Sequence, residues 1–63
     1  MKNMNLVEAK RNFTLFVEAG EYRLARVMLV RVRFLAENEE DLYEANVMEQ
    51  LLDELESKEV ATC

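Results

Sequence analysis

The sequence contains no proline, and its single glycine is Gly20, so very little in the chain forces a helix to end. Residues that favour helices, above all Leu, Ala, Glu, Arg and Met, are plentiful among its 63 positions. Together these observations predict an all-α chain. We expect one domain over residues 1–63, built as a two- or three-helix hairpin or bundle.

A first helix is predicted over residues 6–19. Its apolar residues recur at steps of three and four positions, which places them on one helical face: Leu6, Ala9, Phe13, Phe16 and Val17. Asn5 followed three positions later by Glu8 has the pattern of an N-terminal capping box. Gly20 stands where a helix commonly ends in a left-handed residue.

A second helix is predicted over residues 21–37, and it is unusually apolar. One stripe contains Tyr22, Ala25, Leu29, Val32 and Ala36, and the opposite side carries Leu24, Val27, Val30 and Phe34. A helix that is apolar nearly all round is expected to be buried nearly all round. We therefore expect this helix to be the central element, packed between other helices on at least two faces.

A third helix is predicted over residues 39–58, with a tail at residues 59–63 that we expect to be frayed. Its apolar side contains Ala45, Met48, Leu51, Leu52 and Leu55. Asn38 is a good N-cap, and the acidic residues 39–41 suit the positive end of the helix dipole. A continuous helix over residues 21–58 is the alternative, but it would turn its apolar stripe by about a third of a revolution. We favour a break near Asn38.

A chain of 63 residues is short for an independently stable fold, because a domain of this size buries only about 60% of its unfolded surface. The usual reinforcements are missing. The single cysteine, Cys63, cannot close a disulfide within the chain, and without histidine no ordinary zinc site can be assembled. We expect no cofactor or metal, and we expect the fold to be completed by oligomerisation or by a protein partner.

Enzymatic activity is not expected from these residues. The chain has no histidine, and no hydroxyl or thiol side chain has a base placed beside it by helical spacing. Acidic pairs such as Glu40 with Glu44 and Glu49 with Asp53 are predicted on a solvent-facing side, where acid/base or metal chemistry is not expected. No small-molecule substrate is therefore predicted.

The sequence also gives expectations about location. Its longest apolar run, residues 27–35, is far shorter than the roughly 18 residues of a membrane span and contains Arg31 and Arg33. The first residues show no apolar signal-peptide core. We expect a cytoplasmic protein that does not enter a membrane.

Charge is divided unevenly along the chain. Residues 1–36 contain seven basic and three acidic side chains, a net charge of +4, whereas residues 37–63 contain one basic and ten acidic side chains, a net charge of −9. The simplest interpretation is that arginines of the second helix pair with acids of the third, within one chain or across a dimer. Two alternatives stay open: an acidic surface that mimics an anionic ligand and inhibits a basic or nucleic-acid-binding protein, and nucleic-acid binding through Arg23, Arg26 and Arg33.

The segment Gly20-Glu21-Tyr22-Arg23-Leu24-Ala25 resembles the middle of a tetratricopeptide repeat, where a helix ends in Gly-acid-Tyr and an alanine opens the packing face of the next helix. Leu29 and Val32 match the large and small positions that follow. The likeness covers residues 9–38 and departs from the pattern at Phe13, usually a small residue, and at Glu37, usually proline. The resemblance implies a helical hairpin capped by a third helix, with a role in protein binding.

The predicted function is a non-enzymatic protein-interaction module: a small adaptor, a chaperone-like partner or an inhibitor. The interface is expected on the surplus apolar side of the second helix, with neighbouring arginines setting its register. The residues predicted to form it are Leu24, Val27, Val30 and Phe34, with Arg23, Arg31 and Arg33. The predicted partner is another protein, a second copy of this chain, or both.

Overall fold

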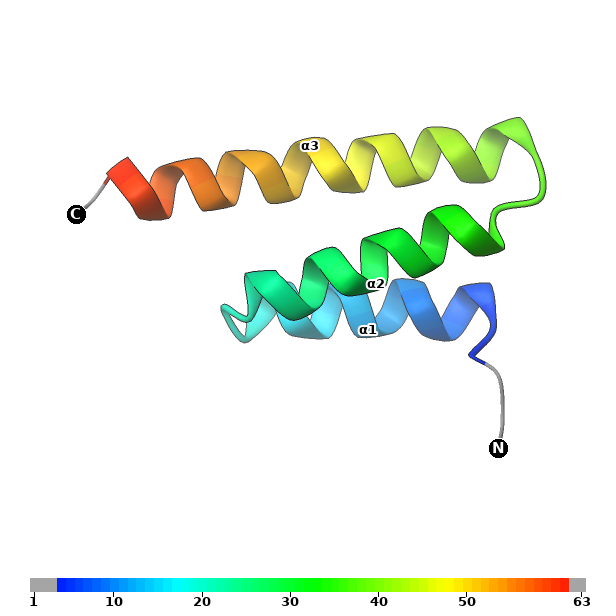
Figure 1. Cartoon of the computed structure of the whole chain (residues 1–63), viewed down its shortest axis with the longest axis horizontal. Helices are drawn as coiled ribbons and strands as arrows, with labels where there is room; N and C mark the ends of the chain where they lie inside the picture. The colour runs from blue at the N-terminus through cyan, green and yellow to red at the C-terminus, as the bar shows by residue number, and fades with distance from the viewer. Residues whose placement is uncertain (1–3, 62–63) are drawn as a thin grey trace.

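In a computed structural model, which describes residues 4–61 and the side chains of residues 4–58, the chain folds into three helices (Figure 1). They are α1 (Leu6–Glu18), α2 (Tyr22–Leu35) and α3 (Glu39–Ala61). The described residues contain no strand. The prediction of an all-α fold is therefore confirmed.

Helix α2 lies between α1 and α3, and successive helices run in opposite directions (Figure 1). It packs against both neighbours, whereas α1 and α3 meet through only a few side chains. The Cα atoms extend over 38 × 27 × 13 Å, so the three helices form a flat body. Its two broad sides are both available to solvent or to a partner.

Helix α1 begins directly after the predicted N-cap, Asn5, and ends shortly before Gly20. The Asn5 side chain accepts a hydrogen bond from the Glu8 N–H at 2.8 Å, and the Glu8 carboxylate accepts one from the Asn5 N–H at 3.2 Å. This reciprocal pair confirms the capping box. At the other end Gly20 has a φ of 76°, and the N–H of the next residue, Glu21, donates to the Phe16 carbonyl at 2.8 Å. Only glycine adopts such a left-handed backbone without steric cost.

The helical structure is interrupted between α2 and α3, as predicted from the rotation of the apolar stripe between the two segments. Ala36 has extended backbone, with φ −62° and ψ 132°, which ends α2. The Asn38 side chain then accepts a hydrogen bond from the Asp41 N–H at 2.9 Å and caps α3. The alternative of one continuous helix over residues 21–58 is therefore wrong.

The helix ends differ from the predicted ends by a few residues. Helix α1 ends one residue earlier than predicted, and α2 starts one residue later and ends two residues earlier. Helix α3 continues to Ala61, three residues beyond the predicted end at residue 58, and the fraying of the tail stays a prediction. The rest of that predicted tail, residues 62–63, lies outside the described residues.

The core is small and consists of side chains from all three helices. Its buried members among the described residues are Ala9, Phe13, Ala25, Leu29, Val32, Ala45 and Leu52. One fully buried alanine stands on each helix, at Ala9, Ala25 and Ala45. Because an alanine projects no further than Cβ, each helix can approach its neighbour closely at that point. Leu52 and Val32 are the largest side chains that are fully enclosed.

Two burial predictions are wrong. Helix α2 is not buried nearly all round: only Ala25, Leu29 and Val32 are buried on it, and its opposite side is exposed. Leu51, predicted on the core side of α3, is 46% exposed. The spacing of apolar residues defines which of them share a face, but α1 and α3 cover only part of the circumference of α2.

Replacing Leu52 with alanine should lower the free energy of unfolding by about 2–5 kcal/mol, because it leaves a cavity in a core with few large members. Leu15→Ala removes the same atoms from a side chain that is 54% exposed. It should change stability by less than about 0.5 kcal/mol. Urea or thermal unfolding followed by circular dichroism measures both; equal effects of the two changes would contradict the core assignment.

Candidate protein-interaction surface

The side of α2 that faces away from the core carries a row of exposed apolar side chains. Val27, Val30 and Phe34 are 55%, 64% and 81% exposed, and they recur at steps of three and four positions. They lie about half a turn around the helix from the core positions. Arg23 and Arg31, both exposed, share this side by the same spacing. We call these five residues the α2 ridge.

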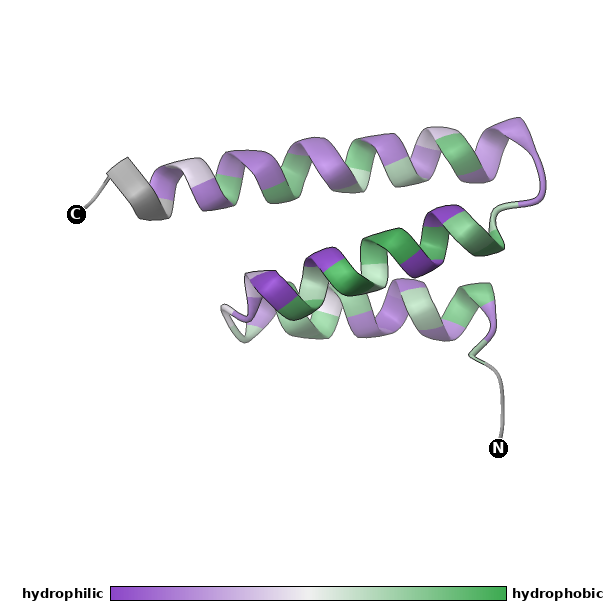
Figure 2. Ribbon diagram, in the orientation of Figure 1, coloured by the Kyte–Doolittle hydropathy of each residue, from purple (hydrophilic) through white to green (hydrophobic). Residues whose placement is uncertain are grey.

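The α2 ridge has the chemistry of a protein-binding surface on a rigid element. An open hollow lies among Val27, Val30, Arg31 and Phe34. Strongly hydrophilic and strongly hydrophobic residues alternate along α2 (Figure 2), and its sequence places arginines between apolar residues. Exposed aromatic and aliphatic side chains beside arginine are typical of the central residues of protein interfaces. The backbone that carries the α2 ridge is anchored by the buried side of α2.

The remaining predicted interface residues lie elsewhere. Leu24 is 45% exposed and does not contribute to the hollow. Arg33 is half-buried and forms an ion pair with Glu49 of α3. This ion pair gives Arg33 a role inside the chain, and its predicted role in setting the register of an interface stays a prediction. The side chain sits toward α3 because it is about 100° around the helix from Phe34.

Arg26 makes the second link from α2 to α3. Its guanidinium donates to the Asp53 carboxylate at 2.8 Å and also pairs with Glu56. These two hydrogen bonds, that of Asp53 first, raise the pKa of Arg26 above its usual value. With the pair between Arg33 and Glu49, they confirm the prediction that arginines of the second helix pair with acids of the third, here within one chain.

Lys10 of α1 pairs with Glu44 of α3 and so joins the two outer helices. The hydrogen bond to Glu44 raises the pKa of Lys10 from its ordinary 10.5. The charged lysine is therefore favoured by folding. Its contribution to stability is present below the pKa of an unfolded lysine and is lost as the pH rises through the higher folded value.

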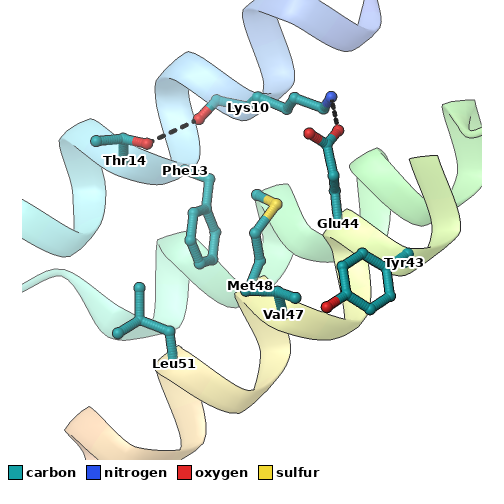
Figure 3. Close-up of a pocket in the computed structure, with 8 residues that line it drawn as sticks. All are labelled: Lys10, Phe13, Thr14, Tyr43, Glu44, Val47, Met48 and Leu51. Atoms are coloured by element: carbon teal, nitrogen blue, oxygen red, sulfur yellow. Dashed lines mark hydrogen bonds and ion pairs between the residues drawn. The ribbon is translucent and has the colours of Figure 1, made fainter. Parts of the chain in front are cut away.

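A second apolar surface, which we call the α1–α3 groove, lies next to this ion pair. Phe13 of α1 and Met48 of α3 point toward each other in it, and α2 passes behind them (Figure 3). Tyr43, Val47 and Leu51 extend along α3 and are 68%, 47% and 46% exposed. The complete lining is Lys10, Phe13, Thr14, Tyr43, Glu44, Val47, Met48 and Leu51.

Sequence reasoning missed this groove, although a signal for it exists. Tyr43, Val47 and Leu51 are spaced by four residues, so they form their own stripe on α3 beside the buried stripe of Ala45 and Leu52. Their spacing could have indicated an apolar strip next to the core. It could not indicate that α1 forms the opposite wall.

Among the described residues, no helix combines the length and the apolar character required to cross a membrane. Within the same part of the chain, no group of three or more acidic, cysteine or histidine side chains is placed to hold a metal ion. The α2 ridge and the α1–α3 groove are thus the two surfaces whose chemistry needs an explanation.

No family model, curated protein or solved structure matches this chain. The resemblance of residues 9–38 to a tetratricopeptide repeat therefore stays a prediction.

Replacing Arg26 with methionine should lower the free energy of unfolding by about 1 kcal/mol, because methionine keeps the packing of the stem but removes two ion pairs at a partly exposed position. At about 1 M salt, where the Debye length is about 3 Å, the loss should become smaller. Urea unfolding at low and high salt measures both effects.

The matched control for this experiment is Arg23→Met. Arg23 has no ion-pair partner among the side chains of residues 4–58. Its replacement should change the free energy of unfolding by less than about 0.5 kcal/mol at either salt concentration. A loss at Arg26 that does not depend on salt would show that the ion pairs do not stabilise the docking of α3.

Proposed function

We propose that this chain is a non-enzymatic protein-interaction module that binds its partner through the α2 ridge. The observation that carries the proposal is the exposure of Phe34, 81%, beside Val27 and Val30 on one side of a helix whose other side is buried. Scattered exposed apolar residues are normal on proteins, but a contiguous group on one rigid helix indicates a contact surface.

The ion pairs between α2 and α3 favour this proposal over the alternative of nucleic-acid binding through arginines of α2. Two of the three arginines in the nucleic-acid alternative, Arg26 and Arg33, are engaged with acids of α3. The same pairs engage Glu49, Asp53 and Glu56, which reduces the net charge that an acidic mimic could present. No specific observation favours either alternative over the α2 ridge.

The proposed partner class is a protein that offers an apolar recess with acidic groups at its rim. The apolar side chains of the α2 ridge would fill such a recess, and Arg31 beside them would meet the rim. Burial of aromatic and aliphatic side chains would supply most of the binding free energy, and the arginine would select the partner by charge. The adaptor, chaperone-like and inhibitor roles all use such a contact.

The proposal predicts that a photoreactive benzoylphenylalanine in place of Phe34 forms covalent adducts with a protein in cells that express the chain. The same residue in place of Leu15, which lies on α1 outside the α2 ridge, should form few. Adducts are measured by mass spectrometry. An adduct with a second copy of the chain supports the proposal, and so does an adduct with another protein.

A charge placed in the α2 ridge should remove those adducts. Val27→Asp should reduce the yield at position 34 at least tenfold, because an aspartate would be desolvated in the contact. Leu15→Asp is the matched control, since Leu15 and Val27 are 54% and 55% exposed. Helicity of both variants is checked by circular dichroism. Unchanged adducts in a folded Val27→Asp variant would contradict the proposed function.

A further inference from the structure

We infer that the partner of the α2 ridge is a second copy of this chain, which receives the α2 ridge in its α1–α3 groove. This inference rests on the proposed function, because it takes the α2 ridge as the contact surface. It adds the identity of the partner and the second surface that takes part. The resulting contact is head to tail, since each copy gives one surface and receives on the other.

The two surfaces lie on opposite broad sides of the molecule. The α2 ridge faces away from the core. The α1–α3 groove opens on the side from which α2 is seen behind Phe13 and Met48 (Figure 3). One copy therefore presents the two surfaces in different directions. A contact of this kind joins unlike surfaces and allows successive copies to add in one direction.

The apolar parts of the two surfaces have similar lengths. Val27 to Phe34 covers seven steps of α2, or about 10 Å along the axis, and Tyr43 to Leu51 covers eight steps of α3, or about 12 Å. The groove is an open hollow of about 450 Å³ in which Phe13 and Met48 form an apolar floor. Phe34, the most exposed large apolar side chain among the described residues, is the natural group to enter it.

The α2 ridge is basic, whereas Lys10 and Glu44 within the groove pair with each other, and acids that are unpaired among the described side chains flank the α3 wall of the groove. Arg23 and Arg31 have no ion-pair partner among residues 4–58, and residues 22–36 contain no acidic side chain. On α3, Glu40 and Glu54 lie three residues before Tyr43 and three residues after Leu51, so they extend the exposed strip at both ends. Both are exposed, and neither has an ion-pair partner among the described side chains.

The same charges disfavour the symmetric alternative, in which the α2 ridges of two copies meet each other. That arrangement would bring four arginines together with no acid from α2 between them. Like charges across a contact reduce affinity and reject the wrong partner. Docking of the α2 ridge into the groove instead brings arginines against glutamates.

The test uses complementary variants of the whole chain. Phe34→Asp disables the α2 ridge and leaves the groove intact, whereas Leu51→Asp disables the groove and leaves the α2 ridge intact. Size-exclusion chromatography with light scattering is run from micromolar to submillimolar concentration. The wild-type mass should rise with concentration above twice the 7.4 kDa of one chain, and each variant alone should remain a monomer. An equal mixture of the two should form a heterodimer and nothing larger, because only one pair of intact surfaces exists between them.

Three outcomes would overturn the inference. If the wild-type chain stays monomeric at all concentrations, the partner is not a second copy of this chain. The proposed function is still supported in that case if position 34 forms adducts with another protein. A Leu51→Asp variant that dimerises alone indicates contact between α2 ridges. An equal mixture that remains monomeric while the wild type associates excludes contact between the α2 ridge and the groove.

Charge variants keep the test decisive if an aspartate at position 34 or 51 unfolds the chain. Arg31→Glu and Glu54→Arg alter exposed positions on the two surfaces. Each should weaken self-association at least tenfold when alone, and mixing them should restore it, because the reversed charges then face each other. The control is Leu15→Asp, which lies outside both surfaces and should associate like the wild type. Failure of the mixture to associate more strongly than either variant would exclude the head-to-tail contact.

Discussion

The packing of α2 against its two neighbours through buried alanines is the constraint on which the rest of the structure depends. Ala9, Ala25 and Ala45, one on each helix, are fully buried. Close approach at these points brings Phe13, Leu29 and Leu52 into one core cluster with them. A larger side chain at any of the three alanines would separate the helices, and the ion pairs above the core would then lose their geometry.

The ion pairs between the helices form at positions that the packing of the core defines. The uneven division of charge along the sequence is explained in part by the pairs of Arg26 and Arg33 with acids of α3. These pairs lie at the edge of the core and are partly exposed, so each adds little free energy. They connect α2 to the acidic edge of α3, whereas Tyr43, Val47 and Leu51 lie on the side of α3 that lines the α1–α3 groove.

The sequence predicts local structure well because local structure depends on neighbouring residues. The capping box of Asn5 and Glu8, the left-handed Gly20 and the break at Asn38 all follow from hydrogen bonds and backbone angles within a few positions. Exposure is harder to predict, since it depends on which faces receive a partner. Val27, Val30 and Phe34 form a recognisable stripe, but only the placement of α1 and α3 reveals that this stripe is uncovered.

The order of the helices also affects how the chain reaches its fold. Packing occurs almost entirely between helices that follow each other in the sequence, because α2 contacts both neighbours and α1 and α3 touch little. Contacts between residues close in sequence require small loops to close, and helical proteins with such low contact order fold in microseconds to milliseconds. The turn at Gly20 joins α1 and α2 through only a few residues, so this hairpin is the natural place for folding to begin, with α3 docking onto a surface already formed.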